Sequence, residues 1–250
     1  RAKKVIIATG ALERPMIFNN NDRPGIMLSS AVKKYADYYG VISGKKTVFF
    51  TNNDSAYESA ISLNKKGIKV EAIIDIREKS NSKIVKETID LGIKIYWSHT
   101  VVDTDGYKRL KEISIMELSK DNQSVVGAKK NIKCDCLGIA GGWTPAVHLF
   151  TQSGGKLKFN KEDQVFLPNK YPSEQISIGS CNGDFELDKI IKNLSTSLKD
   201  FLKIEKTDYD NLNVECSFDE SKKNIWLLPS DTDIGKTKPF VDYQNDATAK

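Results

Sequence analysis

The sequence predicts an α/β protein built on a doubly wound, mainly parallel sheet. Three observations support this prediction. Short apolar runs rich in β-branched residues recur along the chain, stretches with apolar residues at helical spacing lie between them, and glycines or polar residues mark the changes from one to the other. Regular alternation of strand and helix is typical of βαβ units on a shared sheet.

The first expected strand covers residues 5–8, where an apolar run stops at a small-residue turn as a buried parallel strand would. A helix is expected over residues 29–39, because apolar positions there follow helical spacing. Gly40 and Gly44 follow this stretch and are typical helix stop signals.

Residues 47–75 give the clearest pattern. An apolar strand is expected at residues 47–50, a helix at 56–66 and a second strand at 70–74. A polar loop separates the first strand from the helix, and Gly67 ends the helix. Together these elements form one βαβ unit of about 30 residues.

The pattern continues toward the middle of the chain. We expect a helix at residues 82–91, a strand at 93–96, a polar hairpin region within 113–134 and an apolar strand at 136–140 that ends at two glycines. From residue 205 onward the regularity fades, and only residues 225–229 form a strongly apolar island. This last part is interpreted as a connector toward a further domain.

Composition excludes several classes of function. With 250 residues and 39% hydrophobic content, the chain can form one large domain or two of ordinary size. The net charge of +5 comes from lysines scattered over helix-like segments, which indicates a solvated surface rather than a nucleic-acid interface. No apolar run is long enough for a membrane helix, so a cytoplasmic location is expected. The spacing of the cysteines fits neither a metal site nor a disulfide framework, so they are interpreted as structural thiols. They are Cys134, Cys136, Cys181 and Cys216.

The βαβ unit also has the layout of a dinucleotide site. Such a site needs a strand, a tight turn that admits the diphosphate, a helix whose first amides face the phosphates, and an acid at the end of the second strand. The G-x-G-x-x-A positions fall on Thr51, Asn53 and Ala56, and asparagine tolerates left-handed backbone well enough to replace glycine. Asp75 follows the second strand directly and would bind the adenosine ribose, which favours NAD over NADP. Asp54 would cap the helix rather than face a phosphate. The alternative is an ordinary βαβ unit with a polar turn.

Two weaker signals flank this unit. Thr9-Gly10-Ala11 follows the first strand, and Gly179-Ser180 opens a small-residue turn near the other end. Their order is that of flavoproteins with two dinucleotide-binding domains, in which a Rossmann-like NAD-binding domain is inserted in a split FAD-binding domain. The expected division is a partial FAD-binding segment at 1–40, an NAD-binding domain at 41–150, a returning FAD-binding segment at 151–204, and a connector with the start of a downstream domain at 205–250. The candidate cofactor-binding residues are Thr9, Gly10, Ala11, Thr51, Asn52, Asn53, Asp54, Ser55, Ala56, Asp75, Gly141, Gly142, Gly179 and Ser180.

Several longer strings carry a family resemblance. ATGALERP and NNDRPGIM resemble the alpha subunit of heterotetrameric sarcosine oxidase, and opine dehydrogenases and hydrogen cyanide synthase share part of this stretch. The more discriminating strings are TNNDSAY at 51–57, GGWTPAVHL at 141–149 and FVDYQNDATAK at 240–250. Because the chain starts at Arg1 and resembles such a subunit over only about a quarter of that subunit's length, we expect an interior portion of a longer polypeptide.

The resemblance implies an enzyme of alpha, beta, gamma and delta subunits. It would oxidatively demethylate sarcosine to glycine, with formation of hydrogen peroxide and, from tetrahydrofolate, of methylenetetrahydrofolate. FAD and NAD would bind noncovalently, the amine would be oxidised at the FAD of the beta subunit, and a covalently attached FMN would lie near the interface of the alpha and beta subunits. The resemblance therefore implies that this chain binds NAD and part of FAD and contains no catalytic residue.

Some positions depart from the family. The first glycine-rich FAD loop would lie upstream of Arg1, and Ser180 stands where many flavoproteins have aspartate. Relatives with an iron-sulfur module carry two cysteines separated by one residue where this chain has Asp242 and Gln244. Oxygen ligands replace thiolates poorly, so no cluster and no other metal is expected.

The remaining candidates stay open. His99 is interpreted as a surface or turn residue, and His148 lies closer to the expected NAD crevice but has no identifiable acid or nucleophile as a partner. Trp143 would either cover the nucleotide or pack in the core. The alternative functions are the large subunit of a related FAD-dependent opine or amine dehydrogenase, and a nucleotide-binding scaffold without turnover.

Overall fold

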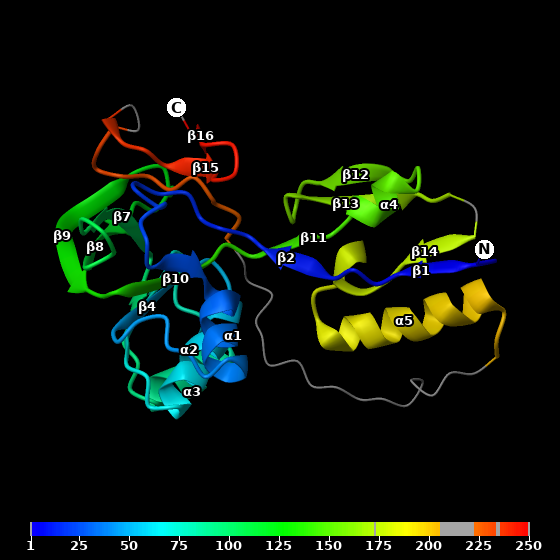
Figure 1. The fold of residues 1–250 in the computed structure, drawn as a ribbon, viewed down its shortest axis with the longest axis horizontal. Helices are drawn as coiled ribbons and strands as arrows, with labels where there is room; N and C mark the ends of the chain where they lie inside the picture. Colours follow the sequence, from blue (N-terminus) through cyan, green and yellow to red (C-terminus); the bar gives the residue numbers. More distant parts are fainter. Residues whose placement is uncertain (1, 173, 206–222, 234–235, 250) are drawn as a thin grey trace. The chain divides into compact units, whose positions relative to one another are not determined.

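The computed structural model describes residues 2–172, 174–205, 223–233 and 236–249. The chain forms two compact units (Figure 1). Unit 1 combines residues 1–12 with 143–216, and unit 2 combines residues 13–142 with 217–250. One unit is therefore inserted into the sequence of the other, as the order of the motifs predicts.

Unit 2 is built on a five-stranded parallel sheet, which confirms the predicted α/β class with a Rossmann-like sheet. Its strands lie in the order β3 (Ile26–Leu28), β10 (Cys136–Ala140), β4 (Thr47–Thr51), β5 (Val70–Asp75) and β6 (Ile95–Trp97). After β4 the chain continues to β5 and β6 on one side of β4. It later forms β10 on the other side of β4. The switch point of the sheet therefore lies between β4 and β10.

Three helices cover one face of this sheet: α1 (Ser29–Tyr38), α2 (Ser55–Lys65) and α3 (Lys83–Asp90). Their buried residues form an apolar core with the side chains that β4, β5 and β10 direct to that face, Phe49 among them. Gly138 in β10 makes room for Phe49, because an added Cβ would lie 2.6 Å from the phenyl ring. A substitution at Gly138 would therefore displace the ring that packs under the helices.

A second, antiparallel sheet covers the opposite face. It consists of β7 (His99–Asp105), β8 (Glu112–Leu118) and β9 (Val125–Lys133), which confirms the expected hairpin region. Ile113 and Ile115 of β8 pack against Phe50 and Ile74 of the parallel sheet in a second apolar core. Unit 2 thus has three layers, helices, parallel sheet and antiparallel sheet (Figure 1).

Unit 1 contains the two ends of the split domain. Strands β1 (Val5–Ile7) and β14 (Gln175–Ser177) pair in parallel, although most of unit 2 lies between them in the sequence. The other elements are the hairpin of β12 (Lys156–Asn160) and β13 (Val165–Lys170), the helices α4 (His148–Gln152), η1 (Gly179–Asn182) and α5 (Leu187–Leu202), and the strand pair of β2 (Ala11–Glu13) and β11 (Trp143–Pro145), where the chain passes from one unit to the other.

The boundaries of the compact units differ from the domain boundaries predicted at residues 40, 150 and 204. Residues 13–40 belong to unit 2 because β3 pairs with β10 and α1 packs on the sheet. Residues 143–150 belong to unit 1. The sequence pattern cannot show this, because a strand's neighbours in the sheet are set by distant residues.

The structure of the segment at 205–250 also differs from the predicted connector. Its residues 206–222, with Cys216, lie outside the described residues, but residues 223–233 return to unit 2. There Leu227 forms a parallel bridge with Ile17, and Leu228 is buried in the second core. Farther on, β15 (Phe240–Asp242) and β16 (Ala247–Thr248) form a hairpin.

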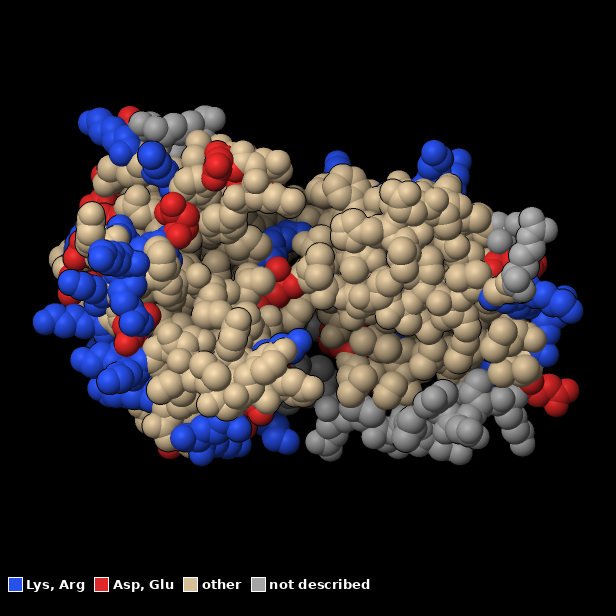
Figure 2. Space-filling model, in the orientation of Figure 1, with Lys and Arg blue, Asp and Glu red and all other residues tan. Residues whose placement is uncertain are grey.

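Surface charge is of mixed sign. Figure 2 shows blue lysine and arginine side chains lying among red acidic ones on unit 2. Several form ion pairs, such as Lys65 with Glu87 and Lys69 with Glu71, each at 2.8 Å. Among the described residues, no helix has both the length and the apolar character to cross a membrane.

The three described cysteines, Cys134, Cys136 and Cys181, are buried free thiols. Burial raises the pKa of Cys134 to about 12 and that of Cys136 to about 11. Both therefore remain protonated at neutral pH, which suits packing rather than metal binding. In the part of the chain that the structure describes, no three His, Cys, Asp or Glu residues are grouped to hold a metal ion.

Candidate dinucleotide site

The candidate site lies where three parallel strands end side by side. Thr51 pairs in register with Ala140 of β10 on one side and with Asp75 of β5 on the other. The Thr51 side chain is buried, and its hydroxyl donates to the carbonyls of Asn53 at 2.8 Å and Ala140 at 3.2 Å. The structure thus brings the predicted turn, the predicted acid and the strand before Gly141 to one edge of the sheet.

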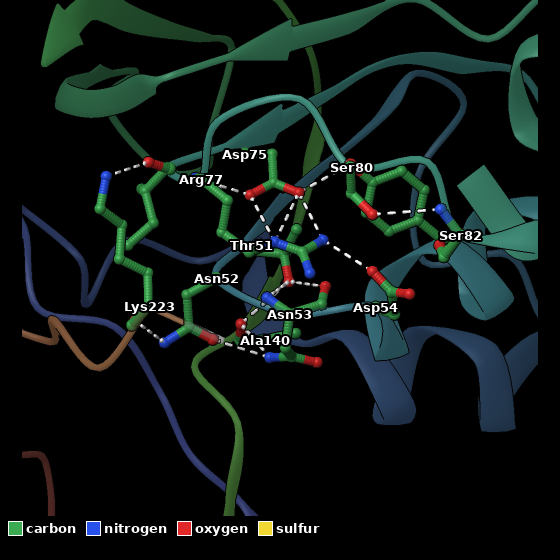
Figure 3. Close-up of polar contacts among 12 residues, drawn as sticks. Thr51, Asn52, Asn53, Asp54, Asp75, Arg77, Ser80, Ser82, Ala140 and Lys223 are labelled. Carbon is green, nitrogen blue, oxygen red and sulfur yellow. Dashed lines mark hydrogen bonds and ion pairs between the residues drawn. The ribbon is translucent and has the colours of Figure 1, made fainter. Parts of the chain in front are cut away.

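Two asparagines close the turn with their side chains. Asn53 Nδ2 donates to Asn52 Oδ1 at 2.7 Å and to the Ala140 carbonyl at 3.2 Å, while Asn53 Oδ1 accepts from the Ser55 amide at 2.9 Å. Neither asparagine has positive φ, so tolerance of left-handed backbone is not why they replace glycine here. Their amide groups join the turn to β10 and to the start of α2 instead (Figure 3).

The prediction that Asp54 caps α2 is wrong. Its side chain makes no capping hydrogen bond, and its Oδ1 accepts from Arg77 Nη2 at 2.7 Å instead. The physical reason is charge: a buried guanidinium competes better for a buried carboxylate than backbone amides do. The capping role passes to Asn53, whose Oδ1 accepts from the amide and hydroxyl of Ser55.

Asp75 belongs to the same buried cluster. Its side chain is fully buried, and its Oδ2 accepts from the Tyr57 hydroxyl at 2.7 Å and from Arg77 Nη2 at 2.8 Å. Its Oδ1 accepts from the Arg77 amide at 2.9 Å. Figure 3 shows the Arg77 guanidinium between Asp75 and Asp54. A ribose hydroxyl could therefore reach Asp75 only by taking the place of Tyr57 or Arg77.

Burial and charge act against each other in this cluster. Desolvation raises the pKa of Asp75, although hydrogen bonds from Arg77 and Tyr57 act in the other direction. Desolvation alone would lower the pKa of Arg77, but its hydrogen bonds and charge contacts with Asp75 and Asp54 outweigh this and raise it. Burial and the charge of Asp75 raise the pKa of Tyr57, so the phenol stays protonated as a donor.

The small residues after β10 allow close contact between segments. Gly141 donates to the Arg14 carbonyl at 2.7 Å, and an added Cβ would lie 2.8 Å from the carbonyl oxygens of both Arg14 and Pro15. Gly142 has φ of 92°, a conformation that favours glycine. The Gly141 carbonyl accepts from Asn52 Nδ2 at 3.3 Å and from the Trp226 indole at 2.6 Å.

The predicted residues of the other motif lie in unit 1. Thr9, Gly10 and Ala11 follow β1, and Gly179 and Ser180 follow its partner β14, so the paired strands bring both segments to the same edge. The Thr9 hydroxyl donates to the Ala146 carbonyl at 2.6 Å, and the Ala146 amide donates to the Gly10 carbonyl at 2.9 Å. The two expected FAD-binding motifs are thus adjacent within unit 1.

Three further candidates do not belong to the turn. His99 starts β7, and its Nδ1 lies 2.6 Å from the Trp97 carbonyl, while His148 is exposed at the start of α4 in unit 1. Trp143 is partly buried in β11. A pocket of about 340 Å³ next to Lys46 and Lys69 lies at the amino ends of β4 and β5, at the opposite edge of the sheet from the turn.

Sequence reasoning missed part of this site. The sequence pattern places Tyr57 in a helix but does not show its contact with Asp75. Lys223 and Trp226 belong to a segment that lies far along the chain from their partners Asn52 and Gly141. Arg77 can be found from the sequence, because a charged residue just after the expected ribose acid is well placed to pair with it. Chemically the cluster offers buried charge, hydrogen-bond donors and a helix N-terminus, which suits binding rather than proton transfer.

No protein-family model matches the chain. The chain is 34% identical to one sarcosine oxidase subunit alpha and 31% identical to a second, in both cases over 99% of this chain. The two relatives come from the P-1 and U-96 strains of Corynebacterium. The resemblance predicted from the sequence strings is therefore confirmed. The chain spans about a quarter of the length of these relatives, 26% in each case.

Two solved structures share the fold. L-proline dehydrogenase from P. horikoshii superposes with a TM-score of 0.57 at 20% identity, covering 82% of this chain and 36% of that one. Thioredoxin reductase from T. acidophilum superposes with a TM-score of 0.55 at 19% identity, covering 74% of this chain and 60% of that one.

Proposed function

We propose that this chain is the dinucleotide-binding portion of a flavin-dependent sarcosine oxidase alpha subunit. NAD binds to unit 2 at the carboxyl end of the parallel sheet, and unit 1 contributes part of an FAD site through Thr9, Gly10, Gly179 and Ser180. The whole enzyme demethylates sarcosine to glycine with release of hydrogen peroxide, together with beta, gamma and delta subunits, FMN and tetrahydrofolate. This chain supplies cofactor binding and no catalytic residue.

One observation carries the proposal. Thr51, Asp75 and Ala140 end three parallel strands in register at a switch point of the sheet, directly before the N-terminus of α2. Open α/β sheets bind ligands in the crevice at such points, and the first amides of a helix attract phosphate. Similarity to sarcosine oxidase alpha subunits over 99% of the chain supports the class of enzyme.

Two parts of the site hold the cofactor. The diphosphate lies on the turn at residues 51–56, where the amides at the start of α2 and the positive end of its dipole favour negative charge. The ribose lies at the end of β5, where it reaches Asp75 in place of the Tyr57 hydroxyl. Arg77 then keeps its bonds to Asp75 and holds the strand end in shape.

Calorimetric titration of the full-length chain with NAD tests binding directly, and saturable binding is expected. Sarcosine-dependent release of hydrogen peroxide by the assembled enzyme tests the reaction. A full-length chain that is folded but binds neither NAD nor NADP would show that the turn is an ordinary βαβ connection.

A further inference from the structure

Lys223 is attached to the turn through its backbone. Its amide donates to the Asn52 carbonyl at 3.2 Å, and its carbonyl accepts from Asn52 Nδ2 at 3.0 Å. Three residues later the Trp226 indole donates to the Gly141 carbonyl, and the Trp226 carbonyl accepts from the Ile17 amide at 2.6 Å. The backbone of Lys223 therefore has a fixed place beside the second residue of the turn.

The side chain of Lys223 runs along the carboxyl edge of the sheet. Its Nζ donates to the carbonyl of Ile76, the residue after β5, at 3.1 Å (Figure 3). The backbone thus lies at the end of β4 and the ammonium at the end of β5. A dinucleotide at this edge would cover the same two points, with its diphosphate on the turn and its ribose by β5.

The positive charge of the ammonium itself favours an anion as its further partner. The Ile76 carbonyl takes one of three N–H donors and carries no net charge. Asp75 and Glu78 act on Lys223 through their charges, but the Asp75 carboxylate is already bonded to Arg77 and Tyr57. Partial burial lowers the pKa of Lys223, a cost that a phosphate beside it would offset.

Arg77 is poorly placed for the same task. Its side chain is only 5% exposed, and its guanidinium bonds both Asp54 and Asp75. The positive charge of Lys223 lies on a partly buried side chain at the rim of the same cluster. The two cations thus have different surroundings although they lie at the end of the same strand.

We propose that Lys223 is a cofactor-binding residue: its backbone stays beside Asn52, and its ammonium leaves the Ile76 carbonyl to contact the diphosphate of the dinucleotide bound at residues 51–56. This inference rests on the proposed function. It means that the segment after position 222, which the sequence pattern assigns to a connector, completes the site. Three parts of the chain then hold the cofactor: the turn, the end of β5 and this returning segment.

Titration of the full-length chain with NAD at low and high salt tests the inference. Lys223→Met keeps the backbone bonds to Asn52 and most of the side-chain length but removes the charge. Its affinity for NAD should fall about tenfold, because one charge-assisted hydrogen bond typically contributes about that factor to affinity. Its affinity should also depend less on salt, which a structural role alone would not cause. Lys223→Arg should stay within a few-fold of the unchanged chain.

Lys34→Met is the matched control, because Lys34 is an exposed lysine on α1. It should bind NAD as the unchanged chain does, and circular dichroism should show all variants folded. If the unchanged chain binds NAD and folded Lys223→Met binds it equally well, Lys223 is structural and only this inference fails. If the unchanged chain binds no NAD, both the proposed function and the role of Lys223 fail.

Discussion

Arg77 Nη2 donates to Asp54 Oδ1 at 2.7 Å, with both side chains almost fully buried. This bond joins the loop after β5 to the residue before α2, 23 positions earlier in the chain. The same nitrogen also bonds Asp75. The geometry of the turn therefore depends on a cation from the next strand end and not only on the residues of the turn.

Replacing Arg77 by methionine should destabilise the protein strongly. Asp54 and Asp75 are 2% and 0% exposed and would be left as buried carboxylates without their cation. Removing one partner of a buried ion pair costs about 3–5 kcal/mol. Urea denaturation followed by circular dichroism should show this loss in the free energy of unfolding.

Lys65→Met provides the comparison, since Lys65 pairs with Glu87 at a similar distance but both side chains are about half exposed. That pair should contribute less than about 1 kcal/mol. Equal losses in the two variants would mean that burial does not strengthen the contribution of the Arg77 cluster.

The Arg77 cluster also shows what the sequence could predict of this site. The strand, turn, helix and acid of residues 47–75 follow from local patterns, and the structure has all four. The partner of Asp54 does not follow, because Asp54 has equally good local roles as a cap or a turn residue. Only the packing of β5 beside β4 decides that Arg77 reaches Asp54 and leaves the cap to Asn53.

Glu13 should make stability depend on pH. Its carboxylate is buried at the N-terminus of α1, where Oε2 accepts from the Ser30 amide at 2.8 Å and from the Ser30 hydroxyl at 2.5 Å. Burial raises its pKa even though both bonds to Ser30 lower it. The folded state therefore binds this proton more tightly than the unfolded state does.

The sign follows from linkage. Between the ordinary glutamate pKa and the raised one, the folded state holds more protons, so stability falls as pH rises through this window. Glu13→Gln keeps an oxygen acceptor for Ser30 and loses the charge. The stability of Glu13→Gln relative to the unchanged chain should therefore increase with pH across the window and then level off, as urea unfolding at a series of pH values from acidic to neutral would show. A constant difference would mean that the Glu13 pKa is not raised.

The cofactor preference should favour NAD. A 2′-phosphate at the end of β5 would approach the carboxylate of Asp75, and two like charges a few ångströms apart cost on the order of 1–4 kcal/mol at effective dielectric constants between that of water and that of a protein site. Arg77 reduces this cost because it is bonded to the same carboxylate. Calorimetry on the full-length chain should still show NAD binding at least about fivefold tighter than NADP. Equal or tighter binding of NADP would rule out Asp75 as the ribose partner.

The fold was predictable where the pattern is local and regular. Each strand of the parallel sheet except β3 was expected, since runs such as residues 47–50 are apolar and β-branched or aromatic. Helix α5 is not among the predicted elements, although Ile190, Leu194 and Leu198 repeat at helical spacing. The return of residues 223–233 could not be predicted, because it is held by a few hydrogen bonds with Asn52, Gly141 and Ile17, all far away in the sequence.

Replacing Ala56 by leucine should abolish NAD binding. Ala56 is fully buried in the first turn of α2, against the core that the helix shares with the parallel sheet. The larger side chain has no space there and would push the start of the helix away from β4, at a cost of about 1–3 kcal/mol in stability. The amides that hold the diphosphate would move with it. NAD titration of the full-length variant, with circular dichroism to confirm folding, measures the effect.

Ala60→Leu separates loss of packing from loss of the site. Ala60 is equally buried in the same core but lies one turn farther along α2. Its replacement should lower stability by a similar amount while leaving NAD affinity close to that of the unchanged chain, because the first turn of the helix keeps its place. A folded Ala56→Leu variant with normal affinity would show that the nucleotide does not bind at this turn. Loss of binding in both variants would show that affinity follows the packing of the whole helix rather than the geometry of the turn.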